Sequence, residues 1–134
     1  MAGYSGTPLN KKLGIKSGFR IYILNPLNDY FDLISPLPDH LTVMEKLKGE
    51  VDMVHLFTDR RVDFEKAFLH AKRYLGKNGM LWVSWPKKTS KLPTDLNENI
   101  IRDFGLKNGL VDVKVCAVND TWSGLKFVFR LTDR

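Results

Sequence analysis

The fold of this 134-residue chain is decided by the stretch Phe19-Arg20-Ile21-Tyr22-Ile23-Leu24-Asn25-Pro26-Leu27-Asn28-Asp29. Its first six residues are apolar apart from Arg20, as is typical of a parallel strand that is covered on both faces. A phosphate- or nucleoside-binding turn after such a strand depends on glycine, because glycine takes positive φ freely and lets the backbone approach a ligand. Here Asn25 and Pro26 follow the strand instead. The stretch therefore predicts an α/β sheet and argues against a cofactor bound at this turn.

Apolar runs downstream predict two more buried strands, at residues 51–57 and 80–85, and a short strand at residues 40–44. Between the two longer strands, residues 61–75 carry apolar side chains at the spacing of one helix face. The residues Gly76-Lys77-Asn78-Gly79 should end that helix, because they suit left-handed conformations. Strand and helix therefore alternate along the middle of the chain.

A second helix is predicted to open at residues 93–98. Asp95 would cap it, and Glu98, three residues later, would reach back to the amide of the capping residue. Its inner face would carry Leu96, Ile100 and Phe104 at a spacing of four residues.

Two alternating segments finish the chain, at residues 111–117 and 125–131. In the first, the valines and Ala117 are predicted to share the buried face, which leaves Cys116 on the polar face. The link at residues 119–124 is rich in turn-forming residues, so the two strands should form a hairpin. The whole pattern predicts a three-layer, Rossmann-like α/β sheet that is mainly parallel and has a C-terminal antiparallel hairpin.

This layout resembles the class I S-adenosylmethionine-dependent methyltransferases, whose parallel sheet closes with an antiparallel hairpin. The local matches lie in residues 13–21, 74–84 and 109–130. The resemblance implies a shortened fold, because a strand–helix unit usual in that family is missing near residues 45–50. It also implies an acid after the second strand for the ribose hydroxyls of the cofactor, and Glu45 stands at that position.

More closely, the chain resembles an uncharacterised bacterial family of small proteins. The shared motifs are a Gly-Tyr-Ser-Gly-Thr-Pro-Leu arm at residues 3–9, Trp-Val-Ser-Trp-Pro-Lys-Lys at residues 82–88 and Val-Asp-Val-Lys-Val-Cys-Ala-Val at residues 111–118. That family brings no established activity to this chain.

Composition limits the classes of protein that fit. Lys and Arg outnumber Asp and Glu by 21 to 15, giving a formal charge of +6, which favours anionic partners without pointing to nucleic acid. We see no membrane span and no secretory signal pattern, and the single Cys116 fits a reducing compartment, so we expect a cytoplasmic protein. We divide the chain into an N-terminal arm at residues 1–18 and one α/β domain at residues 19–134.

In open α/β sheets, ligands bind outside the carboxyl ends of the strands. The residues expected there are Asn25, Thr58, Arg60, Arg61, Trp85, Lys87 and Lys88. Arginine and lysine around an indole would suit a small anionic ligand. The competing interpretation is that these charges are solvated loop residues and that Trp85 packs on the rim of the core. We favour this second interpretation, because runs of charged residues in loops usually face water.

Other conspicuous residues predict no catalytic set. His55 lies among apolar neighbours and should be a hydrogen-bonded core residue, and the histidines lack the companions of a metal site. Lys114 could lower the pKa of the Cys116 thiol, although a bystander thiol is the simpler interpretation. Tyr4 in the arm and Trp122 in the hairpin link are candidate interaction residues, and the hairpin edge offers a surface for a homodimer.

The sequence as a whole favours a non-catalytic binding or regulatory protein on a degenerate methyltransferase-like fold, with a small anionic ligand and no metal. S-adenosylmethionine is disfavoured because the first turn lacks glycine. A divergent methyltransferase that holds this cofactor through unusual contacts is the first alternative. A protein–protein interaction subunit, using the arm or the hairpin, is the second.

Overall fold

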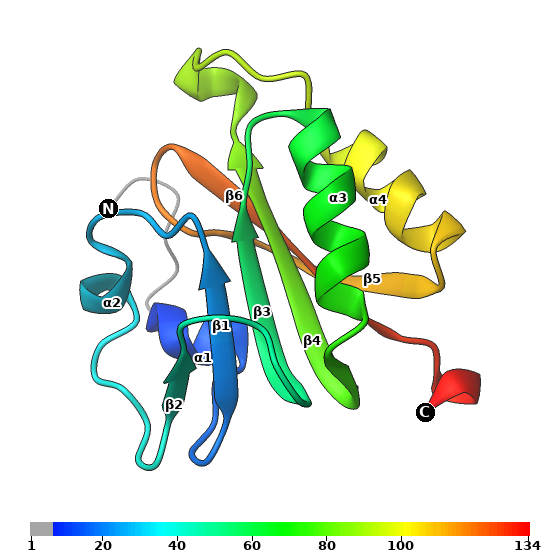
Figure 1. The fold of residues 1–134 in the computed structure, drawn as a ribbon. Helices are drawn as coiled ribbons and strands as arrows, with labels where there is room; N and C mark the ends of the chain where they lie inside the picture. The colour runs from blue at the N-terminus through cyan, green and yellow to red at the C-terminus, as the bar shows by residue number, and fades with distance from the viewer. Residues whose placement is uncertain (1–6) are drawn as a thin grey trace.

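The described residues, 7–134 of the chain, fold around a six-stranded mixed sheet in this computed structural model (Figure 1). The strands are β1 Arg20–Leu24, β2 Thr42–Met44, β3 Val51–Phe57, β4 Leu75–Pro86, β5 Leu110–Ala117 and β6 Trp122–Phe129. Their order is β2-β1-β3-β4-β6-β5; β2, β1, β3 and β4 are parallel, and β6 runs antiparallel between β4 and β5. This arrangement confirms the predicted mainly parallel sheet with a C-terminal antiparallel hairpin.

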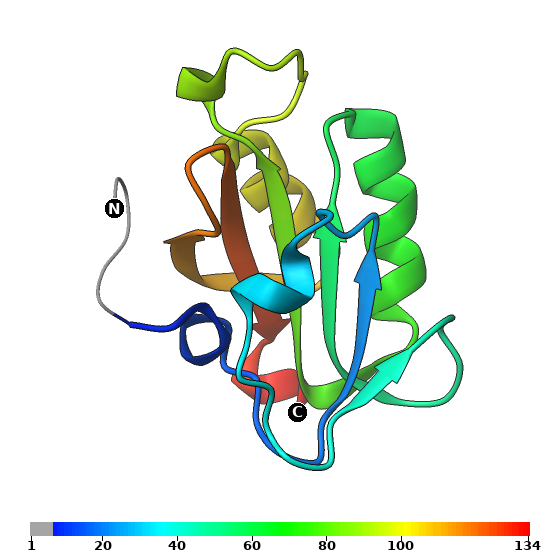
Figure 2. The same cartoon turned by 90° about the vertical axis from the view of Figure 1, so that its left-hand side faces the viewer.

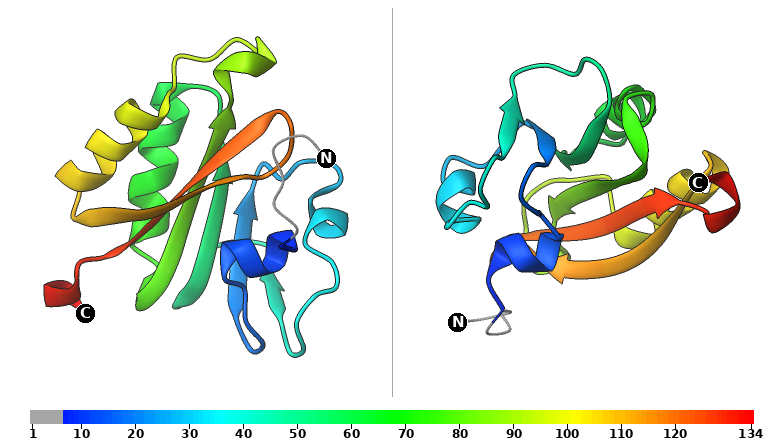
Figure 3. Two further views of the ribbon diagram at one scale, coloured as in Figure 1. Left: turned by 180° about the vertical axis from the view of Figure 1, so that it is seen from behind. Right: turned by 90° about the horizontal axis from the view of Figure 1, so that it is seen from below.

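Helices cover both faces of the sheet and make the molecule three-layered (Figures 2 and 3). The longer helices, α3 Arg61–Lys72 and α4 Glu98–Lys107, pack on one face. The short α1 Leu9–Leu13 and α2 Tyr30–Leu33 pack on the other. Two single-turn 3-10 helices complete the described elements, η1 Lys88–Ser90 after β4 and η2 Leu131–Asp133 at the C-terminus.

Alternate residues of β3 and β4 divide between two cores, as expected for strands buried on both faces. The face under α3 and α4 includes the buried residues Val54, Leu56, Leu81, Val83, Phe64 and Phe68. The face under α1 and α2 includes Leu13, Tyr30, Met53, Phe57 and Trp82. The indole Nε1 of Trp82 donates a 2.9 Å hydrogen bond to the carbonyl of Leu13, which ties α1 to the sheet. Part of the predicted arm therefore belongs to the core.

The predicted end of the first helix is wrong. Helix α3 ends at Lys72, and Gly76 and Gly79 lie within β4 without positive φ. A Cβ on Gly76 would lie 2.6 Å from Oε1 of Glu50, and one on Gly79 would lie 2.9 Å from the carbonyl of Gly76. The two glycines therefore permit close packing beside β3, where the register of the ladder shifts, and do not supply a left-handed turn.

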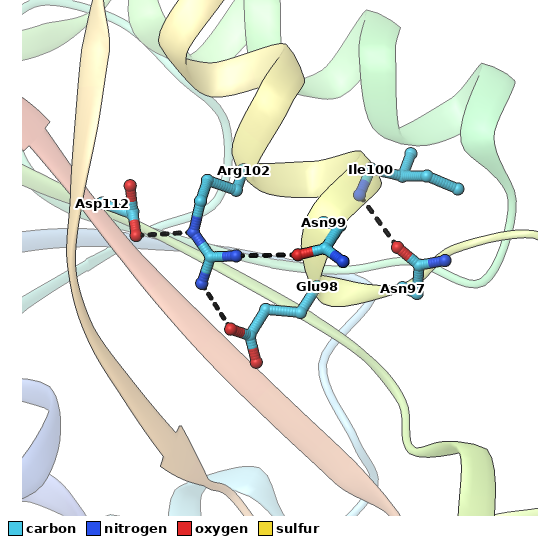
Figure 4. Close-up of polar contacts among 6 residues, drawn as sticks. All are labelled: Asn97, Glu98, Asn99, Ile100, Arg102 and Asp112. Atoms are coloured by element: carbon cyan, nitrogen blue, oxygen red, sulfur yellow. Dashed lines mark hydrogen bonds and ion pairs between the residues drawn. The ribbon is translucent and has the colours of Figure 1, made fainter.

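The predicted cap of the second helix is also wrong. Helix α4 begins at Glu98, and Oδ1 of Asn97 accepts a 2.9 Å hydrogen bond from the Ile100 amide (Figure 4). Asp95 caps the other long helix instead, because its Oδ1 accepts a 2.7 Å hydrogen bond from the Arg61 amide. The buried residues of α4 are Ile101 and Gly105, whereas the predicted Ile100 and Phe104 are only partly buried against the core and Leu96 is buried just before the helix.

The predicted faces of the first hairpin strand are reversed near its end. A register shift between Asp112 and Lys114 adds a bulge to β5, which turns the following residues to the other face. Asp112 pairs with Arg102 of α4, but Cys116 joins the core under α1 and is only 8% exposed. Val115 is exposed instead. Burial raises the pKa of the Cys116 thiol more than the nearby Lys12 and Lys114 lower it, so the thiol is not activated.

Candidate functional site

The carboxyl ends of β1, β3 and β4 meet at one edge of the sheet, at the top of Figure 1. A cavity of about 540 Å³ lies at this edge, beside the end of β4. Its lining includes Trp85, Lys87, Lys88, Thr94, Asn97 and Ser123. Three of the predicted site residues, Trp85, Lys87 and Lys88, therefore lie together on one cavity wall. A volume of this size is within the range of small-molecule sites.

The electrostatics of this cavity are dominated by lysine. Glu98, which also lines it, forms an ion pair with Arg102, and that guanidinium also donates to Asp112 over 2.9 Å and to Asn99 over 3.0 Å (Figure 4). Within residues 7–134, no ion pair or hydrogen bond from the side-chain ammonium of Lys87 or of Lys88 is found. The guanidinium of Arg102 thus offsets part of the charge of the Glu98 carboxylate, and the ammonium groups of Lys87 and Lys88 remain to attract an anion.

The segment between η1 and α4 encloses the cavity because it is held against the turn that follows β3. Thr94 Oγ1 donates a 2.6 Å hydrogen bond to the carbonyl of Asp59, and Asp95 caps α3 at the Arg61 amide. A second depression of about 410 Å³ lies here; Arg60 and Thr94 help to line it. Thr94 lines both depressions, whereas Arg60 lines only the second one.

Other predicted site residues lie outside this cavity. The Arg61 guanidinium points along α3 to Glu65, at 3.2 Å. Thr58 is 5% exposed, and within the described residues its Oγ1 has no hydrogen-bond partner. Asn25 is exposed at the end of β1, on the far side of β3 from the cavity. The sheet edge thus carries the predicted residues, but the structure brings only some of them together.

Of the two candidate interaction residues, Trp122 and Tyr4, the structure describes only Trp122. Trp122 is half-buried and packs on Phe57, with ring centroids 5.5 Å apart, on the face under α1. It therefore folds back over the sheet. Tyr4 lies outside the described residues.

His55 is a hydrogen-bonded core residue, as predicted. Its Nδ1 lies 2.9 Å from the Tyr30 hydroxyl and its Nε2 lies 2.7 Å from the Ser84 hydroxyl, and all three side chains are fully buried. Burial lowers the pKa of His55 to about 3 and raises the pKa of Tyr30 far above its usual range. The neutral imidazole forms hydrogen bonds with both hydroxyls. This hydrogen-bonded group of three side chains therefore stabilises the core and is not accessible to a substrate. In the described residues, no cluster of His, Cys, Asp and Glu could hold a metal ion, and no helix is long and apolar enough to cross a bilayer.

The turn after β1 does not fit a cofactor bound in the manner of a glycine turn. Pro26 has no amide hydrogen to offer a ligand. Asn25 takes a φ of 54°, and its side-chain amide reaches across the ends of β1 and β3 toward the carbonyl of Phe57, at 3.5 Å. Glu45 follows a strand whose last residue, Met44, is level with Tyr22 and thus two residues short of the end of β1. It lines a separate depression of about 490 Å³.

Several residues of the cavity were not predicted from the sequence. Asn97 is a favourable capping residue, and weighing it against Asp95 would have placed the start of α4, and with it one wall of the cavity. Ser123 comes from the hairpin and reaches the cavity because it lies opposite Trp85 in the β4–β6 ladder. No local sequence signal marks that pairing.

Comparisons with known proteins show the fold. No protein-family model matches the chain, and no curated protein matches it. Among solved structures, a fibrillarin from Aeropyrum pernix with natively bound S-adenosyl-L-methionine matches with a TM-score of 0.60 and 12% identity, over 94% of this chain and 70% of that one. A SAM-dependent methyltransferase from Aquifex aeolicus matches with a TM-score of 0.63 and 12% identity, over 91% and 88%. The magnesium protoporphyrin IX methyltransferase from Synechocystis PCC 6803, with bound SAH, matches with a TM-score of 0.59 and 11% identity, over 91% and 78%.

The chain therefore has the Rossmann-like α/β fold of the SAM-dependent methyltransferases. Identities this low show the fold alone, because one fold hosts many activities. The resemblance to an uncharacterised bacterial family stays a prediction.

Proposed function

We propose that this protein is a ligand-binding protein on a methyltransferase fold, and that it holds a small anionic ligand in the cavity beside the end of β4. The observation that carries the proposal is the wall formed by Trp85, Lys87 and Lys88. The two lysines would supply the positive charge. Trp85, which is only 6% exposed, would act as an apolar floor rather than as a stacking surface.

The surroundings support an anion more than a cation. Glu98, the carboxylate that lines the cavity, is held by Arg102, and the nearby Asp95 accepts a hydrogen bond at the N-terminus of α3. Asn97 is occupied in capping α4. Lys87 itself is positioned by its backbone, whose amide donates a 2.8 Å hydrogen bond to the carbonyl of Thr121. The lysines thus extend from a fixed strand end into a partly enclosed site.

A divergent SAM-dependent methyltransferase is the second candidate, and the fold shared with methyltransferases that hold SAM or SAH favours it. It requires contacts to the cofactor other than a glycine turn, because Asn25 and Pro26 follow β1.

A thermal-shift panel separates the two candidates. The ligands are pyrophosphate, AMP, SAM and SAH, each with the wild type and with the double variant Lys87→Gln/Lys88→Gln. A ligand at 100 times its dissociation constant stabilises the folded state by about 2.7 kcal/mol, which corresponds to a rise in Tm of roughly 10 °C for a domain of this size. The matched control is Lys77→Gln/Lys107→Gln, which removes two exposed lysines elsewhere.

We expect pyrophosphate or AMP to raise the Tm of the wild type and of the control more than that of the Lys87→Gln/Lys88→Gln variant. A rise with SAM or SAH, unchanged in that variant, would refute the proposal and favour the methyltransferase. No rise with any of the four ligands would also count against it.

A further inference from the structure

A cluster of lysines lies on the C-terminal hairpin, on the face of the sheet opposite the proposed ligand cavity. Lys114 of β5 and Lys126 of β6 are direct partners in the antiparallel ladder. Lys126 follows Leu125, which belongs to the core under α3 and α4, so it points to the other face, the one covered by α1. Lys114 stands two residues before Cys116, which belongs to the core under α1.

The C-terminal end of α1 meets both of these lysines. The Lys114 ammonium donates a 2.9 Å hydrogen bond to the carbonyl of Lys12. A Cβ placed on Gly14 would lie 3.6 Å from Nζ of Lys126. Since Lys12 and Gly14 are two residues apart in the same turn, the two ammonium groups converge on one small area of the surface. Lys16, exposed just after this turn, lies close enough to act on Lys126 electrostatically.

This arrangement is unfavourable for the protein alone. Like charges directly opposite one another in an antiparallel pair destabilise it. Burial lowers the pKa of Lys126, and the neighbouring Lys114 and Lys16 lower it further. Among the ion pairs of residues 7–134, none involves Lys16, Lys114 or Lys126. The carbonyl of Lys12 carries only a partial negative charge, so its hydrogen bond offsets the charge of Lys114 only in part. The ammonium groups of Lys16, Lys114 and Lys126 thus have no carboxylate partner among the described residues.

We propose that the lysine cluster of Lys16, Lys114 and Lys126 is a second binding site, and that its ligand is an oligophosphate group. A linear chain of phosphates carries several negative charges within a few ångströms, which matches ammonium groups that converge on one place. A nucleic acid spreads its phosphates along a line and is best matched by a basic stripe. The ligand would bridge β5, β6 and the end of α1, and so offset the repulsion between the paired lysines.

The oligophosphate can come from a nucleoside triphosphate or from inorganic polyphosphate, and the experiment distinguishes them. Isothermal titration calorimetry at low salt measures the binding of tripolyphosphate, ATP and adenosine to the wild type. Tripolyphosphate alone tests the phosphate chain, and tighter binding of ATP than of tripolyphosphate would identify the nucleotide as the source. Adenosine should not bind at this site.

The test variant is Lys114→Gln/Lys126→Gln, and the matched control is again Lys77→Gln/Lys107→Gln. Both are made in the Lys87→Gln/Lys88→Gln background, so that the first site does not contribute. We expect the test variant to bind tripolyphosphate at least tenfold more weakly than that background protein, and its Tm without ligand to be higher because the repulsion is gone. The control should bind tripolyphosphate like the Lys87→Gln/Lys88→Gln protein. Equal affinity in the test variant and the control, or binding of an RNA oligonucleotide without binding of tripolyphosphate, would overturn the proposal.

If the test variant does not fold, the wild type still decides the question. Tripolyphosphate should then shift the NMR signals of the side-chain ammonium groups and amides at positions 114 and 126. Shifts confined to other surfaces would refute the site.

Discussion

The fully buried His55 makes the stability of this protein depend on pH. Its imidazole lies between the hydroxyls of Tyr30 and Ser84, and burial lowers its pKa from the ordinary 6.5 to about 3. A histidine whose pKa is lower in the folded state than in the unfolded state stabilises the fold above pH 6.5, and this contribution is lost as the pH falls toward the folded value. In this pH range His55 binds a proton in the unfolded chain but stays neutral in the folded chain.

The size of the effect follows from the two pKa values. The full difference between 6.5 and about 3 corresponds to about 5 kcal/mol, and the part lost between pH 7 and pH 5 is about 2 kcal/mol. Urea denaturation of the wild type and of His55→Gln at both pH values measures it. The wild type should lose about 2 kcal/mol more than the variant over this interval.

His70, which is exposed on α3, supplies the control. The variant His70→Gln should keep the pH dependence of the wild type. Equal losses of stability in the wild type and in His55→Gln would refute the reasoning. If His55→Gln does not fold, an NMR titration of the wild type should show that the His55 ring stays neutral at pH 5, and protonation near pH 6.5 would refute it equally.

Three further predictions concern packing, capping and reactivity. In Gly105→Ala, the new Cβ would lie 2.1 Å from Cε1 of Phe127, so the variant should lose about 1–3 kcal/mol in urea denaturation, although alanine favours the helix by up to about 1 kcal/mol. Stability equal to or above that of the wild type would contradict this packing. Asp95→Ala should lose about 1 kcal/mol because the Arg61 amide loses its cap, and an unchanged urea midpoint would count against that role. Cys116, which is buried and has a raised pKa, should react with a thiol reagent only after unfolding, so rapid labelling of the native protein would disprove its burial.

The central strands, and the fact that they are buried on both faces, could be predicted because the decisive sequence signals are local. The run from Arg20 to Leu24 and the run from Val51 to Phe57 are nearly continuous in apolar residues, and both are strands buried on two faces. The turn-rich link at residues 119–124 likewise predicted the hairpin, although β6 begins inside that link, at Trp122.

The failures share a physical cause, since each depends on a contact between segments distant in sequence. Asp95 caps α3 across the cavity and not the helix that follows it, because the segment before α4 folds against the turn after β3. The bulge before Lys114 reverses the faces of β5, and no composition signal in Asp112 or Val113 marks it. Gly76 permits close packing against Glu50 rather than a turn.

The candidate site was predictable only as a sheet edge. The rule that ligands bind at the carboxyl ends of strands selected Trp85, Lys87 and Lys88, which do line one cavity. The same rule selected Asn25, which lies beyond β3 from that cavity. Composition could not separate these residues, because the separation depends on how the segment before α4 closes over the edge.

We propose that the carboxyl edge of the sheet binds an anion beside β4 and not a methyl-donor cofactor beside β1. Two-dimensional ¹H–¹⁵N NMR, with pyrophosphate and SAM titrated into separate samples of the wild type, tests this directly. We expect saturable shifts at Lys87, Lys88 and Asn97 with pyrophosphate, and no saturable shift at Asn25, Leu27 or Asn28 with SAM. Saturable shifts of Asn25, Leu27, Asn28 and Thr58 with SAM, and none at the lysines with pyrophosphate, would contradict this expectation.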